Sequence, residues 1–450
     1  MATPLFFVFF TFSLLSFPFL SLQTAFIAPI HKDHNSGLYS ISVHVKTPLR
    51  PANLHLDLGG AFSWIDCYNH YNSSSYRLVK CNSPLSDSFN HRVCSSCIQA
   101  PTSICANDAI FSDVYPEKPS IRDEYVDYLN PKLTDSENVV TDVLALSTTD
   151  GSRSGSLRRI SNMPFACVKT NFLRGLARNI IGLAALGRAN ESIPLTISAE
   201  FNSPRIFAIC LSGTRLGSGV AFIGSKGPYV FSTNVDLSKS LIYTPLLFNP
   251  QSGSIYTNWL PSYEYYIGLS AIRINNEAVR FNTSLLQFEP VHGRGGAKIS
   301  TSTTYALLES SIYRAFATAF MKEAAMLNFT LANAVEPFGV CFEGSSVAMT
   351  AAGPRAPVVY LEMEKGKVVW KLGGRNSMVR IKKLGVDLWC LGYVNGGEFP
   401  RTPIVIGGLQ MEDHLLQFDL EKHRFGFSSS ALLQGTSCSK FNFSSSDNLL

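Results

Sequence analysis

One acidic residue of this chain stands where a side chain could do chemistry. Asp57 ends an apolar run and is followed by Gly59 and Gly60, which allow other groups to approach its carboxylate closely. A second segment with similar surroundings, residues 297–303, has Ser300 at the matching position. Two carboxylates a few ångströms apart can share one proton and activate water, whereas a serine hydroxyl stays protonated at physiological pH. Asp57 and Ser300 are therefore predicted to be vestigial dyad positions, and no catalytic residue is expected.

Other catalytic arrangements are excluded by residue spacing. Residues 151–155 have the outline of a nucleophile elbow but carry Arg153 where the serine must stand. The nine histidines are scattered, and no His-Glu-x-x-His spacing occurs, so we expect no metal ion and no cofactor. The net charge of +5 comes without a basic run interleaved with aromatic residues. Nucleic acid is therefore not an expected partner.

The elements that must position Asp57 and Ser300 are mostly strands. Short β-branched and aromatic runs alternate with turn residues, which predicts a mostly β protein. One helix interrupts them, because Ile312, Phe316 and Phe320 recur at four-residue spacing. It is expected to be capped by Ser311 and to run to about Leu327. The strand signals that carry this prediction lie at residues 40–45, 219–224, 265–269 and 367–370.

An internal duplication organises these strands into two lobes. The Asp57 segment is followed by an apolar stretch ending in glycine at residues 179–187, and the Ser300 segment by a similar stretch at residues 403–408. Each apolar stretch is expected to form a strand beside the loop-bearing strand that precedes it. We predict an N-terminal lobe at 26–235, a C-terminal lobe at 236–450, and a cleft between them. A closing hairpin is expected within residues 416–427.

The N-terminus predicts entry into the secretory pathway. Residues 5–20 are apolar and no charged residue precedes Lys32, so residues 1–25 are interpreted as a signal peptide. No later stretch is apolar enough for a membrane span, so the mature chain of about 425 residues is expected to be soluble and secreted.

Ten cysteines and five glycosylation sequons fit an oxidising compartment, which favours disulfides over a metal site. The spacing leaves the disulfide connectivity open. The cysteines are Cys67, Cys81, Cys94, Cys97, Cys105, Cys167, Cys210, Cys341, Cys390 and Cys438. The sequons are at Asn72, Asn190, Asn282, Asn328 and Asn442.

Three motifs make the chain resemble a known family. They are residues 57–67, residues 295–301 and residues 404–413. The chain looks like the plant pepsin-fold proteins (peptidase A1-like) that have lost proteolysis, which include extracellular dermal glycoprotein, xyloglucan-specific endoglucanase inhibitors, xylanase inhibitors, basic globulins and gamma-conglutins. The resemblance implies a bilobal pepsin-like fold with a few short helices. It also marks Leu58 as a second departure, because active proteases of this fold have a hydroxyl residue there that braces the loop.

The resemblance further implies how such a protein could act. In endoglucanase-inhibiting relatives, arginines on two neighbouring C-terminal loops enter the groove of a glycoside hydrolase and bind its carboxylates. One matching position is Arg401, which follows Phe399 in the loop at residues 395–403, and the other is occupied by Leu331. These three residues are the predicted partner-binding residues.

The predicted function is that of a secreted, catalytically inactive inhibitor in plant defence, located in the apoplast or cell wall. Its expected partner is a secreted microbial endoglucanase or related glycoside hydrolase, with xyloglucan-specific endo-β-1,4-glucanase as the first candidate. Xylanase is the poorer candidate, because the histidine that xylanase inhibitors use near the C-terminus has no counterpart around residues 432–435. An active aspartic endopeptidase and a seed-globulin-like storage or peptide-binding protein are the alternatives. The oligomeric state stays open.

Overall fold

The computed structural model describes residues 24–80, 83–85, 110–111, 137–251, 261–383 and 385–445. Strands dominate, so the prediction of a mostly β protein is confirmed. The helices are α2 (Ile193–Phe201), α3 (Ser310–Met326), α4 (Gly374–Ser377) and α5 (Gly408–Met411). The strands of the first half are β1 (Ala25–Lys32), β2 (Tyr39–Val45), β3 (Arg50–Asp57), β4 (Trp64–Asp66), β5 (Arg77–Leu78), β6 (Ile110–Phe111), β7 (Glu137–Thr149), β8 (Arg153–Val168), β9 (Gly182–Ala185), β10 (Ile206–Cys210), β11 (Gly219–Ile223), β12 (Val230–Phe231) and β13 (Val235–Asp236). Those of the second half are β14 (Ile242–Leu247), β15 (Tyr265–Ile267), β16 (Leu269–Ile274), β17 (Glu277–Ala278), β18 (Ala297–Ile299), β19 (Ala306–Leu308), β20 (Leu331–Ala332), β21 (Cys341–Glu343), β22 (Met349–Thr350), β23 (Gly353–Pro354), β24 (Val359–Met363), β25 (Val368–Leu372), β26 (Met378–Lys383), β27 (Val386–Leu391), β28 (Tyr393–Asn395), β29 (Ile404–Ile406), β30 (Leu415–Asp419), β31 (Arg424–Phe427) and β32 (Asn442–Ser445).

The predicted duplication is present in the strand pairing. In the first half β3 pairs in parallel with β9, with Asp57 opposite Ala185. In the second half β18 pairs in parallel with β29, with Ile299 opposite Ile406. Each loop-bearing strand thus lies beside the apolar strand predicted to accompany it, and both belong to one large mixed sheet.

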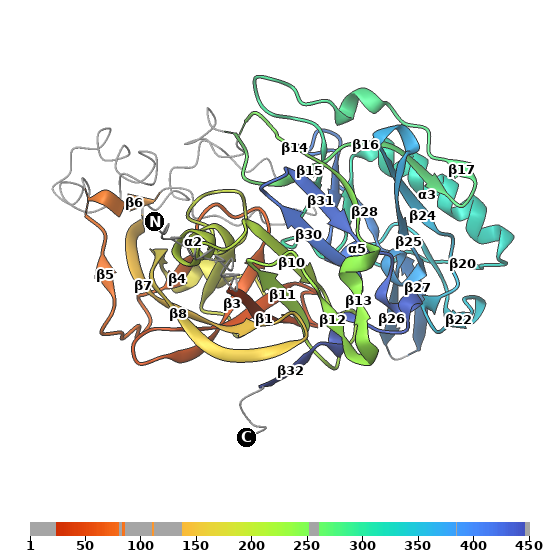
Figure 1. The fold of residues 1–450 in the computed structure, drawn as a ribbon. Coiled ribbons are helices and arrows are strands. Elements are labelled where there is room, and N and C mark those ends of the chain that lie inside the picture. Colours follow the sequence, from red (N-terminus) through yellow and green to blue (C-terminus); the bar gives the residue numbers. More distant parts are fainter. Residues whose placement is uncertain are drawn as a thin grey trace, which may run out of the picture.

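The two halves of the chain meet in the middle of that sheet. Strand β10 pairs antiparallel with β30, and β14 pairs antiparallel with β31, so strands from near the C-terminus close the sheet of the first half. Figure 1 shows β10, β11, β30 and β31 between the N-terminal strands and the blue and cyan C-terminal ones. The rings of Phe207 and Phe418 stack across this junction with centroids 4.7 Å apart. The hairpin expected within residues 416–427 is the pair β30 and β31.

Helix α3 begins two residues earlier than expected, and its cap is different. The carboxylate of Glu309 accepts hydrogen bonds from the backbone N–H groups of Ser311 and Ile312, at 2.9 and 3.2 Å, so Glu309 is the N-cap in place of Ser311. Phe316 and Phe320 are buried, which confirms that the aromatic stripe packs into the core. The helix ends at Leu327 as its C-cap.

Several predictions about the termini and domains remain predictions. The signal peptide lies almost wholly outside the described residues, and β1 begins at Ala25, where cleavage is predicted. The lobe boundary near 235 falls in the short hairpin of β12 and β13. Within the described part of the chain, no helix is long and apolar enough to cross a membrane.

Candidate functional site

Asp57 and Ser300 occupy equivalent positions in the two halves. Both side chains are buried. The carboxylate of Asp57 accepts a hydrogen bond from the Gly59 N–H at 2.9 Å, and the hydroxyl of Ser300 accepts one from the Ser302 N–H at 3.2 Å. The same side-chain-to-backbone turn therefore follows β3 and β18. A single carboxylate stands at the position where the duplication would place two.

The two loops are braced from one side. The Thr301 hydroxyl accepts a hydrogen bond from the Leu58 N–H at 3.1 Å and donates one to the Leu56 carbonyl at 2.7 Å. Leu58, the residue that corresponds to Thr301 in the first loop, is fully buried and has no hydroxyl to offer in return. Thr301 therefore braces the loop of Asp57, but Leu58 cannot brace the loop of Ser300 in the same way, as the departure at Leu58 predicted.

A second carboxylate does lie near Asp57, and the sequence reasoning missed it. A Cβ atom built on Gly59 would lie 3.2 Å from Cγ of Glu264 and 3.9 Å from its Oε1, and 3.6 Å from Oδ1 of Asp57. Both carboxylates therefore border Gly59. Glu264 immediately precedes β15, in the half of the chain that carries Ser300.

Glu264 is held as an anion by its neighbours. Its Oε1 accepts a hydrogen bond from Lys298 Nζ at 2.7 Å, and its Oε2 accepts bonds from Arg401 at 2.9 Å, Tyr266 at 2.7 Å and Ser262 at 2.8 Å. Burial by itself would raise the pKa of Glu264, but the charges of Lys298 and Arg401 outweigh it and hold that pKa well below its usual value. An acid that stays ionised cannot supply the shared proton of a catalytic pair.

Arg401 faces the interior of the protein. Besides Glu264, its guanidinium donates hydrogen bonds to the Tyr266 hydroxyl at 3.2 Å and the Gln251 carbonyl at 2.8 Å, and its side chain is 20% exposed. Its own carbonyl accepts a bond from the Gly295 N–H at 2.8 Å. In the free protein the residue predicted to enter a partner's groove is therefore part of a buried ionic cluster, which we call the Glu264 cluster: Ser262, Glu264, Tyr266, Lys298 and Arg401.

Phe399 and Leu331 are exposed, and they come from different elements. Phe399 lies in the loop between β28 and β29 and is 82% exposed, while Leu331 starts β20 and is 60% exposed. The Phe399 loop has fixed ends, since Gly397 accepts a hydrogen bond from the Ser310 N–H at 2.8 Å and Arg401 is held in the Glu264 cluster. Gly397 has a φ of +89°, which favours glycine at this turn.

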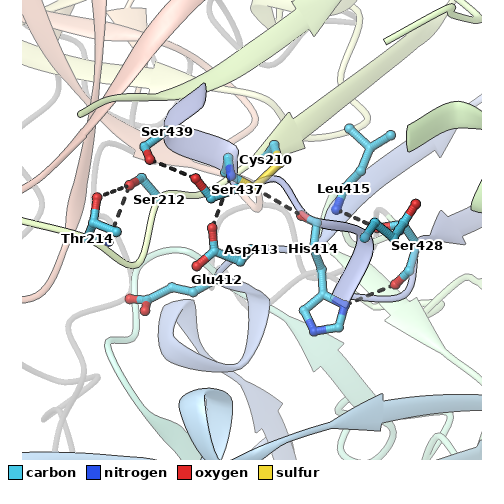
Figure 2. Close-up of a disulfide and its surroundings, with 12 residues drawn as sticks. Cys210, Ser212, Thr214, Glu412, Asp413, His414, Leu415, Ser428, Ser437 and Ser439 are labelled. Carbon is cyan, nitrogen blue, oxygen red and sulfur yellow. Dashed lines mark hydrogen bonds between the residues drawn. A yellow bond between two sulfur atoms is a disulfide. The ribbon is translucent and has the colours of Figure 1, made fainter. Parts of the chain in front are cut away.

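Six of the ten cysteines form disulfides among the described residues. The pairs are Cys67–Cys167, Cys210–Cys438 and Cys341–Cys390. Cys81, Cys94, Cys97 and Cys105 lie outside the described residues. Figure 2 shows Cys210–Cys438, where the Asp413 carboxylate accepts the Cys438 N–H at 3.0 Å. This bridge ties the C-terminal segment to the end of β10. All five sequon asparagines are exposed, as N-linked sugars require, and their glycosylation stays a prediction.

A cavity of about 480 Å³ lies away from these residues. It is lined by residues of β1, β2, β3 and β7, among them Pro29, Ser42, Asn53 and Ser147, and by Phe443 of β32. None of the predicted site residues borders it. Within the described ranges, no group of histidine, cysteine and carboxylate side chains could hold a metal ion.

Comparison with known proteins defines the class. The family profile described as "Xylanase inhibitor N-terminal" matches residues 39–225, and the profile "Xylanase inhibitor C-terminal" matches residues 264–429. The chain therefore belongs to the xylanase-inhibitor-like family of pepsin-fold proteins, and the predicted family resemblance and fold class are confirmed.

Individual relatives cover almost the whole chain. A protein named probable aspartic proteinase GIP1, from Glycine max, is 42% identical over 421 residues, which are 93% of this chain and 92% of that one. The crystal structure of EDGP is 39% identical with a TM-score of 0.83, covering 93% of this chain and 98% of its own. That of conglutin gamma, a basic 7S globulin from lupine seeds, is 28% identical with a TM-score of 0.72, covering 94% and 100%.

Proposed function

We propose that this protein is a secreted, non-proteolytic inhibitor that binds a microbial cell-wall-degrading glycoside hydrolase in the plant apoplast, with a xyloglucan-specific endo-β-1,4-glucanase as its target. The observation that carries the proposal is the Phe399 loop, which presents an almost fully exposed aromatic ring while a buried ionic cluster holds its end. Membership of a family described by xylanase inhibition supports the general class of partner.

The chemistry around Asp57 supports the absence of proteolysis. Peptide hydrolysis by this fold needs two carboxylates that share a proton. Ser300 cannot take part in such sharing, and Glu264, which also borders Gly59, is held ionised by Lys298 and Arg401. The site around Asp57 therefore lacks the pair of carboxylates that share a proton in an active protease.

The Phe399 loop has the properties of an interface anchor. Exposed aromatic side chains on loops with fixed ends contribute area to an interface at a small cost in conformational entropy. The groove of a retaining glycoside hydrolase offers carboxylates about 5–5.5 Å apart at its centre. We assign the contact with the groove to Phe399, an apolar contact to Leu331, and to Arg401 the positioning of the loop through Glu264.

This assignment differs from direct insertion of Arg401, and one pair of variants separates the two. If Arg401 positions the loop, Glu264→Gln and Arg401→Ala both weaken binding, because each breaks the same ion pair. If Arg401 leaves Glu264 to bind the hydrolase carboxylates, Glu264→Gln frees the guanidinium and leaves binding equal or tighter while Arg401→Ala weakens it. Only variants whose near-ultraviolet circular dichroism matches the wild type enter this comparison.

The experiment is a calorimetric and inhibitory titration of a xyloglucan-specific endoglucanase and of a xylanase with the mature protein. We expect a one-to-one complex and loss of endoglucanase activity, with Phe399→Ala weakening the complex at least tenfold. Leu216→Ala is the matched control, because Leu216 is an equally exposed apolar side chain in the other half of the chain. The proposal fails if neither enzyme is bound, or if Leu216→Ala weakens the complex as much as Phe399→Ala.

An active endopeptidase is the second candidate, because the GIP1 relative is named a probable aspartic proteinase. This candidate predicts pepstatin-sensitive cleavage of a denatured protein substrate at acid pH that disappears in Asp57→Ala. That result would replace the inhibitor proposal. A storage role follows only by analogy with the seed globulin, and no residue of the described chain favours it over inhibition.

A further inference from the structure

Three exposed apolar side chains lie on segments close to one of the sequons. Met326, at the end of α3, is 78% exposed, Leu331 of β20 is 60% exposed, and Met349 of β22 is 56% exposed. We call these three side chains the Met326 patch. Exposed large apolar side chains gathered on neighbouring segments favour a surface that another group covers.

Hydrogen bonds hold the segments of the patch together. The Thr330 N–H donates to the Ser346 hydroxyl at 3.1 Å, and the Thr330 carbonyl accepts from the Glu343 N–H at 2.9 Å. The segment after α3 is thereby fixed against the segment that leads into β22, and Met349 follows Ser346 by three residues. The patch is therefore a fixed feature of the folded surface.

Asn328 lies between Met326 and Leu331 along the chain. It lies two residues after Met326 and three before Leu331, which places it within about 11 Å of either. Its φ of +60° is a left-handed conformation that asparagine accepts at a helix end, and its N–H is bonded to the Ala325 carbonyl at 3.0 Å. The side chain is exposed, and the described part of the chain gives its amide no hydrogen-bond partner.

The other sequons have different surroundings. The amide oxygens of Asn282 and Asn442 accept hydrogen bonds from Ser284 and Ser444, in local turns. None of the four other sequon asparagines has a strongly exposed large apolar side chain within three residues on either side. Among the five sequon asparagines, Asn328 is thus the one with strongly exposed large apolar residues within three positions along the chain.

We propose that Asn328 carries an N-linked glycan that covers the Met326 patch, so that a partner reaches the Leu331 side of the surface only in chains that lack this glycan. In the modified chain, the contact with a hydrolase runs through the Phe399 loop alone. A glycan is bulky and solubilising, and its attachment point lies within about 11 Å of Met326 and Leu331 along the chain. The hydrogen bond between Thr330 and Ser346 brings the segment that leads to Met349 beside the same sequon. The part of the proposal about partner access rests on the proposed inhibitory function.

The attachment needs only the ordinary donor of the secretory pathway, an oligosaccharide linked to a lipid diphosphate. The side-chain nitrogen of Asn328 forms a bond to the anomeric carbon of the first sugar and loses a proton. The bond between that carbon and the diphosphate oxygen breaks, and the lipid diphosphate leaves. Thr330 supplies the hydroxyl residue that the sequon requires. Its hydroxyl makes no hydrogen bond within the described residues, so replacing Thr330 breaks none; the bond to Ser346 uses the Thr330 backbone N–H.

The test compares Thr330→Ala, which removes the sequon, with Thr330→Ser, which keeps it. Both are expressed as the full chain in a secreting plant host, and the mass of the peptide containing Asn328 reports the glycan. We expect Asn328 to be modified in the wild type and in Thr330→Ser, and a hydrophobic dye such as ANS to fluoresce several-fold more with Thr330→Ala. An unmodified Asn328 in the secreted wild type overturns the proposal, as does equal dye fluorescence of the two variants.

Two further measurements test the glycan if Thr330→Ala is not secreted and test its effect on partner binding. If Thr330→Ala is not secreted, enzymatic removal of the glycan from the folded wild-type protein must give the same increase in dye fluorescence. For partner access, the affinity for the xyloglucan-specific endoglucanase is expected to rise about three- to tenfold without the glycan, and an unchanged affinity overturns that part. Absence of any complex in the wild type would refute the inhibitor proposal while leaving the mass and dye results to decide the glycan.

Discussion

Replacing Glu264 with glutamine should lower the free energy of unfolding more than the loss of any surface ion pair would. The substitution keeps the shape of the side chain but removes the charge that Lys298 and Arg401 share, at 2.7 and 2.9 Å. All three side chains are largely buried, and Lys298 is the most completely buried of them. Removing one partner of a buried ion pair costs about 3–5 kcal/mol, because the remaining charges lose their compensation. We expect the free energy of unfolding at pH 7 to fall by that amount.

The chain contains a matched control for this variant. Glu277 accepts a hydrogen bond from Lys322 Nζ at the same distance of 2.7 Å, but this pair is exposed to solvent and screened. Glu277→Gln should therefore leave the free energy of unfolding unchanged within error. Urea is the denaturant of choice, since guanidinium chloride would screen the charges under study. Equal stability of Glu264→Gln and the wild type, or an equal loss in Glu277→Gln, would refute the reasoning.

The dependence of this effect on pH has a definite sign. The cluster holds the pKa of Glu264 well below its usual value, so the unfolded chain binds the proton first as the pH falls. The stability contributed by the carboxylate is complete above pH 4.5 and is lost as the pH falls below it toward the folded-state pKa. The gap between the wild type and Glu264→Gln should therefore stay constant from pH 7 to about 5 and narrow in more acidic solution.

Three other perturbations follow from buried groups. Burial lowers the pKa of His55 and that of His414 to about 4, so between pH 6.5 and 4 the unfolded chain binds protons that the folded chain does not. The free energy of unfolding therefore falls by about 3 kcal/mol over that range for each histidine. Urea unfolding of His55→Leu should show a smaller loss over the same range than the wild type. Thr301→Val removes both hydrogen bonds of the Thr301 hydroxyl and should lower the free energy of unfolding by about 2–4 kcal/mol in the same assay. Thr303→Val should cost little, because the buried Thr303 hydroxyl has no hydrogen-bond partner among the described residues. Similar losses in the two variants would contradict the role of Thr301. Replacing Cys210 and Cys438 by alanine opens a loop of 228 residues and should lower the free energy of unfolding by about 5 kcal/mol. The same change at Cys341 and Cys390, which close a loop of 49 residues, should lower it by about 4 kcal/mol. The reverse order of the two losses in non-reducing urea titrations would show that chain entropy does not govern them.

The fold could be predicted from the sequence because its signals are local or repeated. The apolar stretches at 179–187 and 403–408 each end in glycine and each follow a loop-bearing strand. Each of them forms a strand that pairs in parallel with that loop-bearing strand, β9 with β3 and β29 with β18. The helix cap was predicted wrongly, since a glutamate at Glu309 does what a serine usually does at an N-cap.

The site was predictable only in part, because its decisive contacts are not local. Glu264 is 34 residues from Lys298 and 137 from Arg401 along the chain, and the sequence gives no sign that the three meet. A signal was present in retrospect: Lys298 interrupts an otherwise apolar strand, and a charge buried in a strand requires an opposite charge nearby. The inward direction of Arg401 follows from that requirement and not from its own loop.

The pairing of β10 with β30 has a consequence for how the molecule is made. The inner edge of β10 is completed only by a strand that leaves the ribosome near the very end of synthesis. Until then the first half presents an unpaired edge, which is a template for aggregation. We therefore expect that neither half can be obtained alone without aggregation.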